Sequence, residues 1–105
     1  MIIAIDFDGT LTTEGEMGGE LNPRAIEVLK KLMKNHTCCL WTCREGLYLE
    51  VALNMLKEQG IEFEWVNDSP YTNGSRKIVA DYYIDDRMFG IWDWNMIEEH
   101  LINES

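Results

Sequence analysis

The chain has 105 residues, a length typical of one domain, and its 46% hydrophobic and 27% charged residues argue against a disordered chain. Its formal net charge of −10, from 9 basic and 19 acidic residues, argues against a broad electrostatic grip on extended nucleic acid or on an anionic membrane. Residues 1–7 lack the basic start of a secretory signal, and no apolar run approaches a membrane span. From its length, we expect residues 1–105 to form a single domain.

The three cysteines lie in one short stretch, at positions 38, 39 and 43. Their number is odd, and adjacent cysteines rarely form a disulfide with each other. This usage is typical of a reducing compartment, so we expect a cytoplasmic protein.

The first predicted element is a buried strand over residues 2–7, which ends in two carboxylates spaced by one residue. Side chains alternate along a strand, so Asp6 and Asp8 start on the same side, roughly 6–7 Å apart. Such acidic groups are costly unless a cation or a shared proton offsets their repulsion. Gly9 then allows a sharp turn. The competing interpretation is a plain acidic turn, because turns favour Asp and Gly.

The rest of the chain alternates between strands and helices. Hydrophobic periodicity, capping residues and turn residues predict, in order, a polar loop with a small hairpin over 9–21, a helix from Asn22-Pro23 to about 35, a strand over 37–42, a helix over 45–59, a strand over 63–66, a turn-rich loop over 67–75, a short helical turn over 76–80, a strand over 82–84 and a helix over 91–101.

This alternation predicts a three-layer α/β/α Rossmann-like fold with a parallel sheet and right-handed crossovers. The strand order about 3-2-1-4 would place the first and fourth strands side by side, with the second strand on the other flank of the first. The carboxyl ends of these strands would then share one edge, where open α/β sheets bind ligands. That edge would carry Asp6, Asp8, Thr42, Asp85 and Asp86.

Four segments carry a family resemblance. The segment Asp6-Phe7-Asp8-Gly9-Thr10 resembles the first motif of the haloacid dehalogenase-like superfamily, whose members are mostly phosphatases. Leu40-Trp41-Thr42 is similar to its second motif, Lys77 to its third, and Tyr83-Ile84-Asp85-Asp86 to its fourth. All four occur in the expected order across residues 2–87, which is most of the chain.

The resemblance implies a Mg²⁺-dependent phosphomonoester hydrolase that acts on a phosphorylated substrate. Asp6 would be the nucleophile that forms an aspartyl phosphate, and Asp8 the general acid and base. The ion would be held by Asp6, by the backbone carbonyl of Asp8 and by Asp85, with Asp86 binding directly or through water. Thr42 and Lys77 would hold the phosphoryl oxygens, with Gly9 in the same phosphate-binding set.

Several of these assignments have rivals. Arg76 competes with Lys77, which we prefer because it stands eight residues before Asp85. Thr42 has the competing interpretation of an ordinary strand-end threonine, and the acidic pair 85–86 that of a solvated turn paired with the adjacent arginine. Arg44 either contacts substrate or caps surface charge, and the sequence does not decide between these roles.

A second phosphatase signature is formally present. Cys38 and Arg44 are separated by five residues, as in cysteine-dependent phosphatases. That chemistry needs a tight loop whose backbone N–H groups surround phosphate. The intervening residues contain no glycine and are strand-like, so we expect Cys38 and Cys39 to be core residues.

The gaps between motifs are too short for the cap domain of larger relatives, so we expect an open site unless a second subunit of a homo-oligomer covers it. The substrate class stays open among nucleotides, sugar phosphates and macromolecular phosphates. The alternatives to an enzyme are a phospho-accepting signalling or binding module and a non-catalytic member of the fold. Receiver domains use similar residue types, but in a different chain order.

Overall fold

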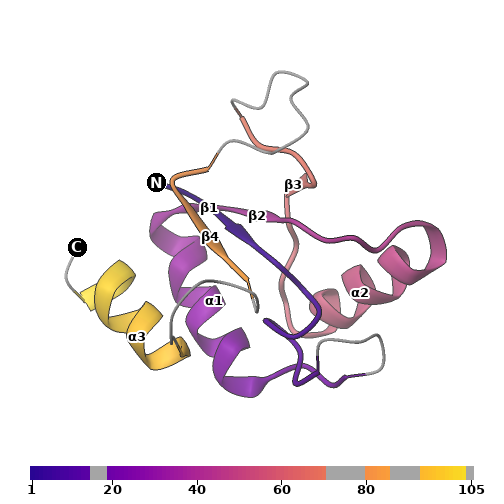
Figure 1. Ribbon diagram of the computed structural model, residues 1–105, viewed down its shortest axis with the longest axis horizontal. Coiled ribbons are helices and arrows are strands. Elements are labelled where there is room, and N and C mark those ends of the chain that lie inside the picture. Colours follow the sequence, from indigo (N-terminus) through magenta and orange to yellow (C-terminus); the bar gives the residue numbers. More distant parts are fainter. Residues whose placement is uncertain (15–18, 71–79, 86–92, 104–105) are drawn as a thin grey trace.

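The computed structural model describes residues 1–14, 19–70, 80–85 and 93–103, and its strands form one parallel sheet. The sheet has the order β3-β2-β1-β4, which confirms the predicted order (Figure 1). The strands are β1 (Ile2–Ile5), β2 (Thr37–Leu40), β3 (Trp65–Val66) and β4 (Tyr82–Ile84). Two predicted site residues, Lys77 and Asp86, lie outside the described residues.

In the described ranges, three α-helices accompany the sheet: α1 (Pro23–Asn35), α2 (Gly46–Glu58) and α3 (Trp94–Glu98), the last followed by a π-helical turn, η1 (Glu99–Asn103). Helix α1 begins as its sequence predicts. The Asn22 carboxamide oxygen accepts the N–H groups of Arg24 and Ala25, and Pro23 occupies the first position, where its missing N–H costs nothing.

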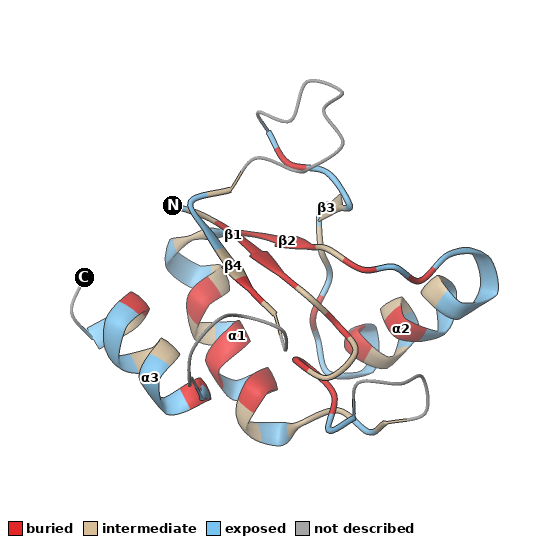
Figure 2. Cartoon of the chain, in the orientation of Figure 1, coloured by how far each residue is buried: buried red, intermediate tan, exposed pale blue. Residues whose placement is uncertain are grey.

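The two faces of the sheet differ in what covers them. On one face, Ile3, Ile5 and Leu40 pack in a core with buried residues of α1, α2, α3 and η1. Buried positions therefore follow the strands and the inner side of α1 (Figure 2). The alternate strand residues Ala4 and Cys39 are buried on the other face, against partly buried Trp41, Trp65, Tyr83 and Ala80.

Strands β3 and β4 lie at opposite edges of the sheet. Ala80, just before β4, is one of the residues that pack on the second face. The parallel sheet, with its strand order and with helices packed on one face, is a Rossmann-like α/β fold, as predicted. Within the described ranges no cap domain is present, and no helix there is long and apolar enough to cross a membrane.

The strands are shorter than their apolar runs suggest. We expected the first strand to reach residue 7, but β1 ends at Ile5 because the Phe7 carbonyl already accepts the N–H groups of Thr10, Leu11 and Thr12. Likewise β2 ends at Leu40 rather than 42, and β3 starts at Trp65 rather than 63. The early ends of β1 and β2 leave the residues that follow them free to form turns at the carboxyl edge, where the candidate site lies.

The loop after β1 contains the expected small hairpin, and the last helix begins later than expected. Thr12 and Leu21 form an isolated antiparallel bridge, supported by a hydrogen bond from the Thr13 N–H to the Glu20 carbonyl. Helix α3 starts at Trp94, after the Asp93 side chain caps it by accepting the Met96 N–H. Positions 91–92 of the predicted helix, and 76–79 of the predicted helical turn, lie outside the described residues.

Candidate active site

The carboxyl ends of β4, β1 and β2 bring predicted site residues from distant parts of the chain to one edge. Ile5 is in register with Ile84, and the Asp6 N–H donates to the Ile84 carbonyl at 2.9 Å. Asp6 and Asp85 therefore each follow a paired residue on neighbouring strands. On the other flank, the Trp41 N–H donates to the Ile5 carbonyl, which brings the chain before Thr42 beside that before Asp6.

Asp8 forms a two-pronged ion pair with Arg44. The Arg44 Nε and Nη2 atoms donate to Asp8 Oδ2 and Oδ1 at 2.9 and 2.7 Å. The Arg44 side chain is 6% exposed and that of Asp8 18%, so little water screens the pair. The alternatives for Arg44 were a substrate contact or a cap for surface charge. Because the pair with Asp8 is shielded from solvent, Arg44 does not cap surface charge. Asp8 is a partner of Arg44 that the sequence did not indicate.

Arg44 is held by three further contacts. Its Nη1 donates to the Tyr48 carbonyl at 3.2 Å, and its guanidinium carbon lies 4.8 Å from the ring centroid of Phe7. Its backbone N–H donates to Thr42 Oγ1 at 3.1 Å. The hydrogen bonds to Asp8 raise the pKa of Arg44, against the opposing effect of burial. The guanidinium is thus a fixed positive charge beside Asp8.

Thr42 is buried and fixed through both its backbone and its hydroxyl. Its N–H donates to the Asn67 side-chain oxygen at 2.7 Å, and its hydroxyl accepts the Arg44 N–H. A hydroxyl that accepts one hydrogen bond still has its own hydrogen to donate. This arrangement suits the predicted role of Thr42 toward a phosphoryl oxygen.

Sequence reasoning missed Asn67 as a site residue. It has φ 53°, in the left-handed region that non-glycine residues rarely adopt, and its N–H donates to the Leu40 carbonyl at 2.7 Å. It thus closes the gap between the ends of β3 and β2. The available signal was an asparagine, which tolerates this conformation, directly after a predicted strand.

Gly9 makes the predicted sharp turn after the first motif. Its φ of 79° lies in the region where a side chain is unfavourable. Its N–H donates to the Thr12 hydroxyl at 3.0 Å, and that hydroxyl donates to the Glu14 carbonyl. The Gly9 N–H is therefore used inside the loop, and its part in phosphate binding stays a prediction.

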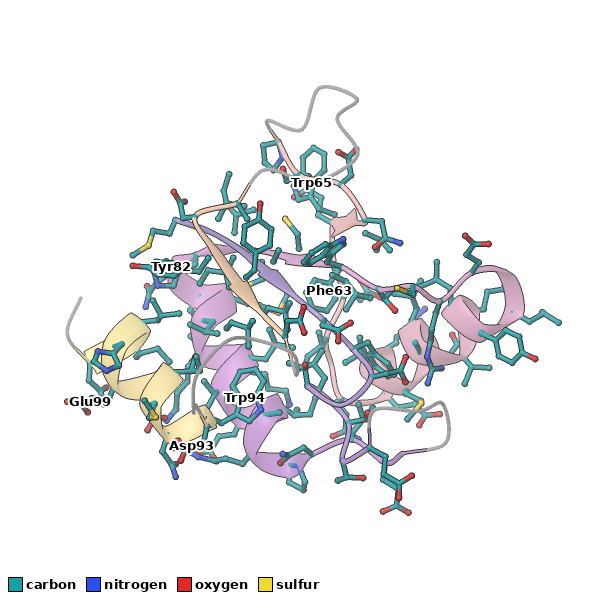
Figure 3. The ribbon with its side chains drawn as sticks, in the orientation of Figure 1. Phe63, Trp65, Tyr82, Asp93, Trp94 and Glu99 are labelled. Atoms are coloured by element: carbon teal, nitrogen blue, oxygen red, sulfur yellow. The ribbon has the colours of Figure 1, made fainter. Side chains whose placement is uncertain are left out.

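A hollow of about 350 Å³ lies beside this loop, between it and the starts of α1 and α3. Its lining includes Gly9, Thr12, Asp93 and Trp94. The Trp94 Nε1–H donates to the Thr10 carbonyl at 3.2 Å, which ties α3 to the first motif (Figure 3 labels Asp93 and Trp94 at the start of α3). The turn after Asp8 is thus supported from the C-terminal part of the chain.

The donors at this edge fit a hard divalent cation in part. Two carboxylates, Asp6 and Asp85, follow neighbouring strands. The family resemblance adds the main-chain carbonyl of Asp8, which would give an all-oxygen set of the kind that Mg²⁺ prefers. The described ranges contain no group of three His, Cys, Asp or Glu side chains arranged to hold a metal. A site with two carboxylates and one carbonyl does not require such a group.

The cysteine-phosphatase alternative fails on burial and on charge. Cys38 is buried, and burial raises the pKa of its thiol to about 12, so it is not a thiolate nucleophile at neutral pH. The arginine that would complete that signature, Arg44, is instead paired with Asp8. Cys38 and Cys39 are core residues, as predicted, and Cys43 is exposed and free.

No protein-family model matches the chain, and neither does any curated protein. The fold and sequence are similar to a solved structure of a conserved protein coded by a locus from Bacteroides thetaiotaomicron, with 39% identity and a TM-score of 0.86. The similarity covers 100% of this chain and 92% of the Bacteroides chain, so it includes every element that carries the site.

Proposed function

On the premise that the chain belongs to the same family as that conserved Bacteroides thetaiotaomicron protein, we propose that it is a Mg²⁺-dependent phosphomonoester hydrolase of the haloacid dehalogenase type. The observation that carries the proposal is the edge shared by β1 and β4. There Asp6 and Asp85 follow paired residues, and the carboxylate of Asp8, two positions on, is fixed by Arg44. Sequence position and geometry thus agree on the same carboxylates.

In the first step of the proposed reaction, a carboxylate oxygen of Asp6 attacks phosphorus. A new P–O bond to Asp6 forms as the P–O bond to the substrate ester oxygen breaks. The electron pair of the broken bond goes to the ester oxygen, which takes a proton from Asp8 and leaves as an alcohol. The product is an aspartyl phosphate on Asp6 and an ionised Asp8.

In the second step a water molecule attacks the phosphorus of the aspartyl phosphate. Asp8 takes one proton from that water, and the P–O bond to Asp6 breaks, so that Asp6 regains its carboxylate and inorganic phosphate is released. A carboxylate has about four lone-pair sites, of which the two bonds from Arg44 use two. Asp8 therefore keeps sites for exchanging a proton while paired.

The remaining groups bind and orient the phosphoryl group. The Thr42 hydroxyl would donate to one of its oxygens, and Lys77 would supply a positive charge. Asp6, Asp85 and the Asp8 carbonyl would hold Mg²⁺, with Asp86 beside them. When bound, the ion would offset repulsion between an anionic nucleophile and an anionic substrate.

The partners and setting follow from composition and remain part of the proposal. The partner is a phosphorylated substrate, and the net charge of −10 disfavours extended nucleic acid. The free cysteines fit a reducing compartment such as the cytoplasm. A second subunit would be one way to cover a site that lacks a cap domain.

The test is hydrolysis of p-nitrophenyl phosphate with and without Mg²⁺, with Asp6→Asn and a matched control. Asp81→Asn is the control, since Asp81 lies at the opposite edge of the sheet, where its carboxylate accepts the Ile2 N–H. We expect metal-dependent turnover in the parent and in Asp81→Asn, and none in Asp6→Asn. Unchanged turnover in Asp6→Asn would reject the nucleophile. A long-lived phosphoprotein without turnover would favour the signalling alternative.

A further inference from the structure

Resting on the proposed phosphatase function, we infer that Arg44 is a positioning residue that aims the Asp8 carboxylate at the leaving oxygen of the substrate. No motif of the family resemblance assigns a role to Arg44. The inference comes from the contacts of its guanidinium and backbone, which connect the acid–base group to the phosphate-binding threonine.

The pair with Asp8 constrains direction as well as distance. Two parallel N–H···O bonds, at 2.9 and 2.7 Å, fix both oxygens of the carboxylate, whereas a single bond would leave the group free to rotate. Lysine supplies only a point charge and cannot make this two-pronged contact. The orientation of Asp8 therefore depends on the planar fork of an arginine.

The guanidinium is itself held in place. Its third nitrogen is bonded to the Tyr48 carbonyl, and its face lies over the ring of Phe7, which is fully buried. Phe7 is also the residue between Asp6 and Asp8 in the chain. The support under Arg44 is thus part of the same rigid segment that carries the nucleophile.

The backbone of Arg44 extends the link to Thr42. Its N–H donates to Thr42 Oγ1 at 3.1 Å, two residues earlier in the chain. One residue therefore fixes two groups that must act on the same phosphate ester: a hydroxyl for a phosphoryl oxygen and a carboxyl for the ester oxygen. A misplacement of about 1 Å at such a site costs on the order of 100-fold in rate.

This role makes a prediction that a structural role does not. A positioned proton donor matters most when the leaving oxygen is strongly basic and matters little when the leaving group departs readily as an anion. Loss of Arg44 should therefore slow phenyl phosphate, with its poor leaving group, far more than 2,4-dinitrophenyl phosphate. General damage to the fold or to phosphate binding would slow both substrates alike.

The experiment compares kcat/KM for these two esters, with Mg²⁺ present, in the parent, Arg44→Met and Arg44→Lys. This constant covers the steps up to release of the leaving group and so isolates the proton donation by Asp8. For phenyl phosphate we expect a fall of about 100-fold in Arg44→Met and a similar fall in Arg44→Lys, which keeps the charge but not the fork. For 2,4-dinitrophenyl phosphate we expect a fall of less than about 10-fold in both.

Each other outcome overturns the inference. Equal losses on the two esters would place Arg44 in folding or phosphate binding, and full activity in Arg44→Lys would show that charge alone suffices. A parent protein that hydrolyses neither ester would refute the proposed function itself, and with it the inference. If Arg44→Met does not fold, the ratio of the two losses in Arg44→Lys decides the question alone, because activity on 2,4-dinitrophenyl phosphate reports a folded site.

Discussion

Two substitutions of Asn67 should separate the cost of its backbone conformation from the value of its side chain. Asn67 has φ 53°, and its side-chain oxygen accepts the Thr42 N–H at 2.7 Å. Both Asn67→Ala and Asn67→Gly remove this hydrogen bond. Only alanine keeps a Cβ atom in a left-handed conformation.

The magnitudes follow from these two features. Loss of the bond to the Thr42 N–H costs about 1 kcal/mol in both variants. Alanine adds about 1.5 kcal/mol for the left-handed backbone, so Asn67→Ala should lower the free energy of unfolding by about 2.5 kcal/mol. Glycine avoids that strain, but the greater conformational entropy of the unfolded glycine variant offsets part of this advantage in stability. We expect Asn67→Gly to be about 1 kcal/mol more stable than Asn67→Ala.

Urea unfolding followed by circular dichroism measures this difference. Equal slopes of the free energy against urea would show that the variants expose the same surface on unfolding, so that the midpoints report stability. A difference of about 1 kcal/mol corresponds to roughly 4–8 °C in Tm for a domain near this size. If Asn67→Ala is as stable as Asn67→Gly, the left-handed conformation carries no cost and the reasoning is wrong.

Two further predictions concern charge and thiol chemistry. Arg24 and Lys31 of α1 hydrogen-bond to Glu98 of α3 and lower the pKa of its carboxyl from 4.5 to about 2. The stability that these bonds contribute is full above the unfolded pKa and is lost as the pH falls through the folded pKa. Between about pH 5 and pH 2, the urea midpoint of Glu98→Gln should therefore fall less than that of the parent. Of the three thiols, only Cys43 is exposed. A thiol reagent should therefore label one cysteine quickly in the native protein and all three in urea. A second cysteine that reacts quickly in the native protein would contradict the burial of Cys38 and Cys39.

The strand order was predictable because short apolar runs alternate with amphipathic helices, and few topologies accommodate that pattern. The end of β1 was not predictable from hydrophobicity, because Phe7 continues the apolar run while its carbonyl already accepts the hydrogen bonds of a turn. The partner of Arg44 could not be predicted either. A long cationic side chain reaches several carboxylates at a crowded edge, and Asp8 is 36 positions away in the chain.

The central position of β1 has a consequence for how the protein is made. On one side of β1, Ile3 pairs with Cys38 of β2. On the other side, Ile3 pairs with Tyr82 of β4, which comes much later in the chain. During synthesis that side of the strand therefore has open N–H and C=O groups until β4 emerges from the ribosome, which makes it a site for aberrant pairing between nascent chains. Contacts this distant in sequence also slow folding. Translation pauses or chaperone binding before position 84 should therefore affect the yield of folded protein more than those acting later.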